Sequence, residues 1–181
     1  MREISVDTRL ITERLCLRAV ALSDVEMTWS ATRFDGFNDG MIWDRPKTRG
    51  QLVDRTQESL SQWKEGSLFT YTVELVDAST PIGRVAIKQT NALHVWNVGF
   101  WIHPDFWGQG YATEAASAVL DFGFSALHAS KIVTAHAIWN IRSKRVIEKL
   151  GFRYTGENPC GFRKQGKPVA EYEYEIETPV L

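Results

Sequence analysis

The spacing of hydrophobic positions changes several times along this chain. Residues 12–18 alternate Leu15 and Leu17 with mostly polar neighbours, a pattern typical of a half-buried strand. Further stretches rich in β-branched and aromatic residues, bounded by turn residues, predict six more strands. We expect these strands at residues 68–76, 82–88, 95–102, 131–138, 152–162 and 169–176.

Four other segments place apolar residues at helical spacing. The first opens near Ser23, where Glu26 stands at the spacing of a capping box. The last is bounded by Asn140 as N-cap and by Gly151 as C-terminal stop. Between the first two helices, residues 33–46 form a loop too rich in aromatic side chains to be fully solvated. The three helices after the first are expected over residues 48–65, 111–127 and 141–150.

The order of these elements predicts a mixed α/β (α+β) protein. One strand and two helices precede three strands, after which helices and strands alternate up to a final pair of strands. We expect one central, mixed and mostly antiparallel sheet with helices on both faces. No repeat, low-complexity stretch or linker interrupts the sequence, so residues 1–181 are expected to form a single domain.

The composition excludes several classes of protein. With a net charge of −1, the chain lacks the basic excess of a general nucleic-acid binder, so we expect no direct nucleic-acid binding. Cys16 and Cys160 stand far apart and the four histidines lack metal-ligand spacing, so neither a disulfide framework nor a metal site is expected. The sequence shows no apolar leader and no membrane-spanning run, which favours a cytoplasmic protein without membrane contact.

The chemistry is expected in residues 98–115, where a strand runs into a glycine-containing loop that opens a helix. Free backbone N–H groups and the positive end of the helix then point at one spot, and glycine lets a bulky anion approach closely. The loop has no GK[ST], so it is not a P-loop for nucleoside triphosphates. Gly-x-Gly before a helix is by itself a weak signal and also fits a plain turn.

A longer pattern is more specific. The text GFWIHPDFWGQGYATEA, followed by a strand and then NIRSKRVIEKLGF, resembles the core of the GCN5-related N-acetyltransferase (GNAT) superfamily. With the opening TERLCLR, it is similar to the ribosomal-protein N-acetyltransferase (RimJ/RimL-type) branch. The resemblance implies the GNAT fold, acetyl-CoA as donor and a primary amine as acceptor.

The resemblance also implies which residues bind acetyl-CoA. A strand whose backbone holds the pantetheine arm, a pyrophosphate loop and the start of the following helix are expected to contribute. The residues carried over are Phe100, Trp101, Ile102, Trp107, Gly108, Gln109, Gly110, Tyr111, Ala112, Asn140 and Ser143. The strand residues can also pack in the core, and Asn140 can also serve as a plain N-cap. Neither structural role excludes contact with acetyl-CoA.

Ser143 is the expected catalytic residue. Many relatives carry a tyrosine that protonates the departing thiolate, but its position here holds Ile147, and the RimJ/RimL branch is expected to use the serine that corresponds to Ser143. A serine that bonds back to a helix carbonyl is the alternative. The implied reaction is direct attack of a neutral amine on the thioester in one ternary complex, with positioning and hydrogen bonds to the developing oxyanion as the main contributions.

The general base is left open. Many relatives have a glutamate where this chain has Asn97, which cannot accept the proton. A water relay is the default expectation. The side chains that remain as candidates are Glu171, Glu173, Asp35, Asp39, Asp44 and His103.

The resemblance implies that the acceptor binds among the first two helices, their connecting loop and the last hairpin. Trp29, Phe34, Phe37 and Trp43, with the nearby aspartates, suit a cationic amine. The resemblance favours a protein N-terminal α-amine, and a small amine (polyamine, aminoglycoside or amino acid) is the alternative. A non-catalytic acyl-CoA-binding sensor is the alternative of another class. The sequence leaves open whether the chain is a monomer or a homodimer.

Overall fold

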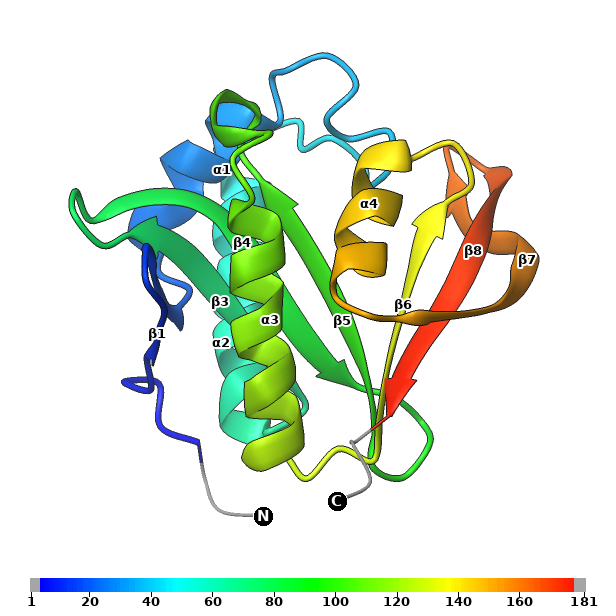
Figure 1. Ribbon diagram of the computed structural model, residues 1–181. Coiled ribbons are helices and arrows are strands. Elements are labelled where there is room, and N and C mark those ends of the chain that lie inside the picture. The colour runs from blue at the N-terminus through cyan, green and yellow to red at the C-terminus, as the bar shows by residue number, and fades with distance from the viewer. Residues whose placement is uncertain (1–3, 178–181) are drawn as a thin grey trace.

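A computed structural model describes residues 4–177 and consists of an eight-stranded sheet and four α-helices (Figure 1). The strands are β1 (Leu10–Ile11), β2 (Leu15–Ala19), β3 (Leu68–Leu75), β4 (Thr80–Gln89), β5 (Val95–Ile102), β6 (Lys131–Ala137), β7 (Arg153–Lys164) and β8 (Lys167–Glu177). The helices are α1 (Val25–Ala31), α2 (Arg49–Glu65), α3 (Tyr111–Ser125) and α4 (Ile141–Lys149). The spatial order is β1-β2-β3-β4-β5-β6-β8-β7, and only β5 and β6 run parallel. The predicted mixed, mostly antiparallel sheet is confirmed.

Helices cover both faces of the sheet. In Figure 1, α3 and α4 lie in front of the sheet and α2 lies behind it. A Cβ on Gly123 of α3 would meet the side chains of Ile87 and Ile132 at 2.7 and 2.8 Å, so the absence of a side chain lets this helix lie close to the strands. Strand alternation therefore buries one set of residues under α3 and turns the other set, which includes Thr72, toward α1 and α2.

Local signals predict the longer helices well and one cap wrongly. The hydroxyl of Thr48 accepts the Gln51 amide at the start of α2, and Gly66 ends the helix at φ +73°. The expected capping box between Ser23 and Glu26 does not form. The Asp24 carboxylate accepts the Ala21 amide instead, while the Glu26 carboxylate pairs with Arg49 on α2. The tertiary ion pair competes successfully with the local cap.

The sheet splits between β5 and β6. These strands pair at only three positions, Val95 with Lys131, Trp96 with Ile132 and Asn97 with Val133. Beyond them, β6 continues to pair with β8 and β5 continues to pair with β4, so the two strands diverge (Figure 1). The divergence leaves the edge of β5 from Val98 to Ile102 without a neighbouring strand on that side, within the described chain.

The structure differs from the sequence prediction in the end of one helix and in one short strand, whereas the last hairpin turns where it was expected. α3 ends at Ser125 instead of residue 127. The two-residue strand β1 has no signal in the hydrophobic pattern. The final hairpin turns at Gln165 and Gly166, both at positive φ, and places β8 between β6 and β7.

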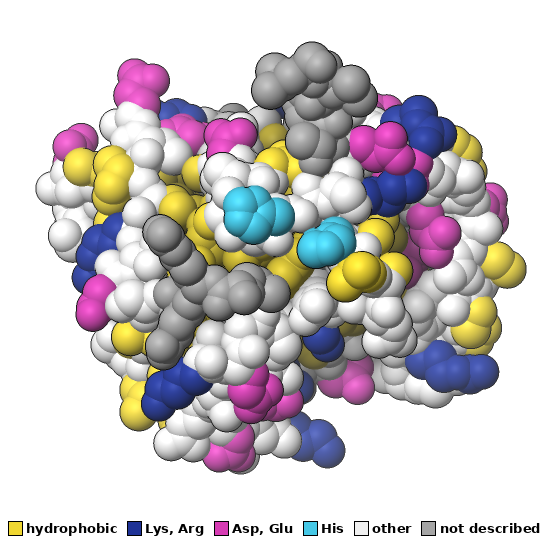
Figure 2. Space-filling model, turned by 90° about the horizontal axis from the view of Figure 1, so that it is seen from below, with side chains coloured by type: hydrophobic (Ala, Val, Ile, Leu, Met, Phe, Trp, Pro, Cys, Tyr) yellow, Lys and Arg dark blue, Asp and Glu magenta, His cyan; other side chains and the backbone are white. Residues whose placement is uncertain are grey.

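The lower end of the molecule carries charges of both signs. Figure 2 shows acidic and basic side chains interspersed around this end, and neither sign gathers into a patch on that face. None of the helices in the described chain is both long and apolar enough to cross a membrane.

Candidate active site

A cavity of about 1160 Å³ lies at the split in the sheet. Its walls come from the open edge of β5, from β6, from the first turn of α3, from one side of α4, and from α2 with the loop that precedes it. The cavity therefore joins the side of α3 and α4 to the side of α1 and α2. Two molecules can enter from opposite faces and meet beside β5.

The loop that enters α3 presents a row of free amides. Gly108 and Gly110 lie at φ +79° and +83°, in the left-handed region that favours glycine. The amides of residues 108–112 have no acceptor within the described chain. The Gly110 carbonyl accepts the amides of Thr113 and Glu114 and so begins the helix. Converging N–H groups at a helix N-terminus fit the pyrophosphate of coenzyme A.

Side chains from other elements hold this loop in place. The indole nitrogen of Trp107 donates to the carbonyl of Ile102 at 2.7 Å, which ties the loop to the end of β5. Arg14, just before β2, donates from Nη1 to the Gln109 carbonyl at 3.1 Å and pairs with Glu114 of α3. The amides therefore keep their orientation without a bound anion.

The first turn of α4 lies across the cavity from the loop. The side-chain oxygen of Asn140 accepts the Ser143 amide at 3.2 Å, so the predicted N-cap is confirmed. The Ser143 hydroxyl has no hydrogen-bond partner among the residues described, so it does not bond back to a helix carbonyl. Ser143 lines the cavity, and its hydroxyl is free for a ligand.

Three basic residues of α4 were missed by the sequence analysis. Arg142 stacks on the ring of Trp107, with its guanidinium carbon 4.1 Å from the ring centroid. Arg145 and Lys149 also line the cavity. Their spacing (i, i+3, i+7) places all three on one side of the helix and could have signalled a phosphate-binding face.

Most of the expected acetyl-CoA residues meet at this cavity. Phe100, Trp101 and Ile102 of β5 line it, as do Trp107, Gly108, Gly110, Tyr111, Ala112, Asn140 and Ser143. Gln109 is the exception: it is exposed and does not line the cavity, because its carbonyl is turned toward Arg14. Its backbone amide has no acceptor among the described residues and remains available to a ligand.

Of the six candidate bases, Glu171 lines the cavity. It is half-buried on β8, and burial, with the nearby charge of Glu173, raises its carboxyl pKa. His103 is buried away from the cavity, where its ring lies 3.2 Å from the Ser30 hydroxyl and burial lowers its pKa despite the charge of Asp105. The other four do not line the cavity: Glu173, Asp35, Asp39 and Asp44.

The acceptor side differs from its prediction. Phe37 and Trp43 line the cavity, and Phe37 packs edge-on against Trp101 with ring centroids 5.4 Å apart. Trp29 lies outside the cavity under two arginine side chains, and Phe34 packs on His103. The expected aspartates do not line this side of the cavity. Basic side chains of α2 and β4 line it instead, together with one carboxylate. The charged side chains of α2 and β4 that line this side are Arg55, Glu58, Arg84 and Lys88.

The loop between α1 and α2 closes over this side of the cavity. The ammonium group of Lys164 on β7 donates to the carbonyls of Asn38, Met41 and Trp43 at 2.8, 3.1 and 2.7 Å. A Cβ on Gly40 would lie 2.5 Å from Nδ2 of Asn140, so only glycine lets the loop approach the start of α4 so closely.

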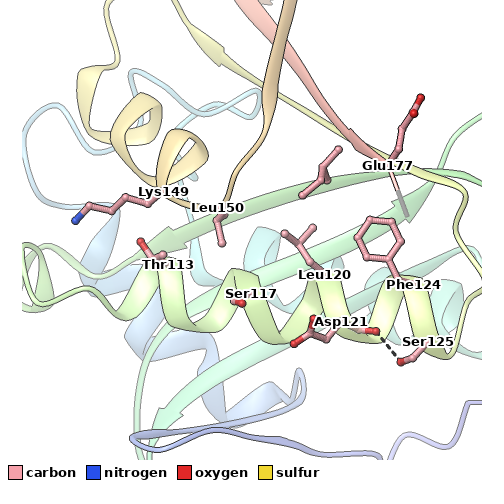
Figure 3. A pocket seen from close by; sticks show the side chains of 10 residues that line it. Thr113, Ser117, Leu120, Asp121, Phe124, Ser125, Lys149, Leu150 and Glu177 are labelled. Carbon is pink, nitrogen blue, oxygen red and sulfur yellow. Dashed lines mark hydrogen bonds between the residues drawn. The ribbon is translucent and has the colours of Figure 1, made fainter. Parts of the chain in front are cut away.

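A second hollow, of about 620 Å³, lies between α3 and the C-terminal ends of α4 and β8 (Figure 3). Thr113, Ser117, Leu120, Asp121 and Phe124 line it from α3, facing Lys149 and Leu150. The expected site residues do not line it. No cluster of three or more metal-ligating side chains forms in residues 4–177.

Comparisons with known proteins agree with this geometry. Residues 14–153 match the family model described as "Acetyltransferase (GNAT) domain". The uncharacterized protein YkkB of Bacillus subtilis is 30% identical over 94% of this chain and 97% of its own length. The uncharacterized N-acetyltransferase YnaD of the same organism is 33% identical over 59% of this chain, and the match spans 62% of YnaD.

A solved structure shares the whole architecture. RimL, a ribosomal L7/L12 alpha-N-protein acetyltransferase in complex with coenzyme A, superimposes with a TM-score of 0.84 at 15% identity, over 94% of this chain and 98% of that structure. The likeness shows a common fold. The family match establishes that this chain belongs to the GNAT family of N-acetyltransferases.

Proposed function

We propose that the chain transfers the acetyl group of acetyl-CoA to the α-amine of an acceptor, by direct attack in a ternary complex. The observation that carries the proposal is the cavity that passes through the split sheet. It connects a row of free amides on one side to an aromatic loop on the other. A donor and an acceptor bound from opposite faces would meet beside β5, where proximity supplies much of the rate.

The residues at the cavity fit acetyl-CoA. The amides of residues 108–112 would hold the pyrophosphate, and Arg142, Arg145 and Lys149 would face its phosphates. The open edge of β5 would hydrogen-bond the pantetheine arm. The backbone there, near Trp101 and Ile102, would also meet the developing oxyanion.

In this reaction the acceptor nitrogen forms a bond to the thioester carbonyl carbon, the C–S bond breaks, and the nitrogen loses a proton. The free hydroxyl of Ser143 would donate its hydrogen bond to the departing sulfur. Glu171, the candidate base that lines the cavity, would take the proton of the amine, directly or through water.

A protein N-terminal α-amine is the favoured acceptor class, because RimL acts on such an amine and shares the fold. A small-molecule amine is the alternative, and the test includes both. The sensor reading is less favoured, because the free Ser143 hydroxyl and Glu171 occupy one cavity with room for a second substrate.

The first experiment is a calorimetric titration with acetyl-CoA and with coenzyme A, followed by acetylation assays on peptides and small amines. We expect binding at one site per chain and turnover of an α-amine. In the Ser143→Ala variant, kcat should fall by about 10²-fold while donor affinity is kept. Ser117→Ala, a helical serine outside the cavity, is the matched control.

The possible outcomes distinguish an acetyltransferase that uses Ser143 from one that does not, and both from an acyl-CoA sensor. Unchanged kcat in Ser143→Ala would remove Ser143 from the mechanism and leave the acetyltransferase in place. Donor binding without acetylation of any amine would favour the sensor. Absence of donor binding would contradict the proposal as a whole.

A further inference from the structure

Arg84 is a cation in the cavity wall that neither the donor nor the reaction uses. It lies on β4, opposite Thr72 of β3 and Trp101 of β5 in the strand register, on the face covered by α1 and α2. Its side chain is half-buried and lines the cavity on the acceptor side. It therefore stands one strand away from the open edge of β5, where the two substrates would meet.

The guanidinium of Arg84 has no hydrogen-bond partner among residues 4–177. Its Nε and Nη2 are buried and make no hydrogen bond within the described residues. The nearby carboxylate, Asp24, is already occupied. It accepts both terminal nitrogens of Arg18 at 3.0 and 2.7 Å, the Thr72 hydroxyl at 2.6 Å and the Ala21 amide at 2.8 Å.

An unpartnered buried cation is unusual, because removal of a charged donor from water costs free energy that a hydrogen bond must offset. Burial lowers the pKa of Arg84 to about 10, so the group is still charged at neutral pH. In Arg49, an exposed arginine of this chain, the same two nitrogens bind a carboxylate. Its Nε and Nη2 donate to the two oxygens of Glu26 at 2.6 and 3.0 Å. The chemistry that fits two adjacent guanidinium donors is a planar pair of oxygens.

We propose that Arg84 binds a carboxylate carried by the acceptor, which restricts the acceptor class to α-amines with a carboxylate close to the amine. Two sources present this chemistry: a free amino acid, or a peptide whose N-terminal residues include Asp or Glu. The inference rests on the proposed acetyl transfer. It is supported by the charge of the acceptor side, where Arg55, Arg84 and Lys88 face the cavity and Glu58 is the carboxylate that α2 contributes.

The test compares matched acceptors in the wild-type enzyme. Free glutamate and alanine are paired with their carboxamides, and a peptide that begins with Glu is paired with the same peptide that begins with Gln. We expect kcat/KM to be about 10-fold or more higher for a carboxylate form than for its amide, the value of a charge-assisted hydrogen bond. The free amino acid pair and the peptide pair distinguish the two sources.

Two variants assign the preference to Arg84. Arg84→Met should lower kcat/KM by about 10-fold or more for the carboxylate acceptor, leave the amide acceptor nearly unchanged and leave acetyl-CoA affinity unchanged. Arg84→Lys should restore part of the preference. Arg49→Met is the matched control and should leave the preference unchanged, since Arg49 lies outside the cavity and already pairs with Glu26. Removal of an unpartnered buried cation should leave Tm equal or higher, whereas a structural role would lower it.

Further outcomes would overturn the inference. No preference for carboxylates in the wild type would do so, as would an equal loss for both acceptors in Arg84→Met, which would place Arg84 at the reacting atoms. A titration of the acetylated carboxylate product into protein saturated with coenzyme A reads the same contact without turnover. If that product binds the wild type and Arg84→Met equally, the inference fails; if donor binds but no amine reacts, the proposed function fails instead.

Discussion

The hydroxyl of Thr134 on β6 donates a hydrogen bond of 2.9 Å to the carbonyl of Val98 on β5, one position beyond the last paired residues of the two strands. Both residues are buried, and Thr134 lines the cavity. A side chain thus takes the place of the next rung of the parallel ladder. The contact fixes the point at which the strands separate and the cavity begins.

Replacement of Thr134 by valine should weaken this junction. The change keeps the volume but removes the donor, so the free energy of unfolding should fall by about 1 kcal/mol. Affinity for acetyl-CoA should fall as well, because the open edge of β5 loses its fixed starting point. Urea denaturation and calorimetry measure the two effects. Thr70→Val is the control, since Thr70 also lines the cavity and its side chain makes no hydrogen bond in the described chain. Equal losses in both variants would contradict the interpretation.

Two glycines at positive φ separate the effect of backbone strain from the effect on acetyl-CoA binding. Gly108 and Gly66 lie at φ +79° and +73°, and a Cβ on either would meet nothing within 4 Å. Alanine at each position should therefore cost a similar 1–2 kcal/mol or so of unfolding free energy. Only Gly108→Ala should also weaken acetyl-CoA binding, by about tenfold, because it disturbs the amides that face the pyrophosphate. Equal donor affinities in the two variants would exclude this loop from the donor site.

The ion pair between Arg18 and Asp24, next to the start of α1, should set how the free energy of unfolding changes at acid pH. Burial alone would raise the pKa of Asp24, but hydrogen bonds from Arg18, Thr72 and the Ala21 amide outweigh it and hold the pKa below its usual range. A lowered pKa means that this stabilisation is complete above the unfolded value of about 4 and is lost as pH falls through the folded value. Asp24→Asn should cost about 1.5–3 kcal/mol at pH 7, because it removes the charge-assisted hydrogen bonds from Arg18 and leaves Glu74 as the one carboxylate paired with that guanidinium among the described residues.

The exposed pair of Glu26 and Arg49 is the control for this prediction. It has comparable two-point geometry but lies in solvent, so Glu26→Gln should change stability little. Urea midpoints measured at pH 7 and at pH 3 test both variants. A similar effect of the two substitutions would show that burial does not set the strength of the Asp24 pair.

The pH dependence of turnover should identify the base. Burial and the charge of Glu173 raise the pKa of Glu171, and a base works only when it is deprotonated. The rate should therefore rise with pH through this raised pKa. Glu173→Gln removes the like charge and should move the rise to lower pH, whereas Glu171→Gln should lower the rate and abolish the rise. A profile that is identical in Glu171→Gln would favour a water relay without this carboxylate.

Lys164 should control the acceptor side. Its ammonium holds three carbonyls of the loop between α1 and α2, so Lys164→Met should raise the KM for the acceptor by several-fold and leave acetyl-CoA affinity unchanged. Steady-state kinetics with each substrate varied measures both values. Lys167→Met, at the exposed hairpin turn, should change neither. An effect on donor affinity alone would place the loop with the other substrate.

The acceptor side could not be read from the sequence because its residues come from distant segments. The aspartates and aromatics of residues 33–46 are close in sequence, yet Phe37 and Trp43 face the cavity while Asp35 and Asp39 face solvent. Arg84 sits in an ordinary strand pattern, and only the register with Trp101 brings it to the site. The basic face of α4, by contrast, could have been predicted, because its three basic residues stand at helical spacing in the sequence.

The sequence by itself determined the elements, the family motif and the loop that presents its amides, since these depend on local periodicity, glycine conformation and caps within a few residues. Tertiary structure decided where β5 and β6 part, that β8 lies between β6 and β7, and which charges face the acceptor. Those features depend on strand pairing between segments far apart in the chain, and on competition for partners such as the one that moved Glu26 from its cap to Arg49. Local sequence carries no record of that competition.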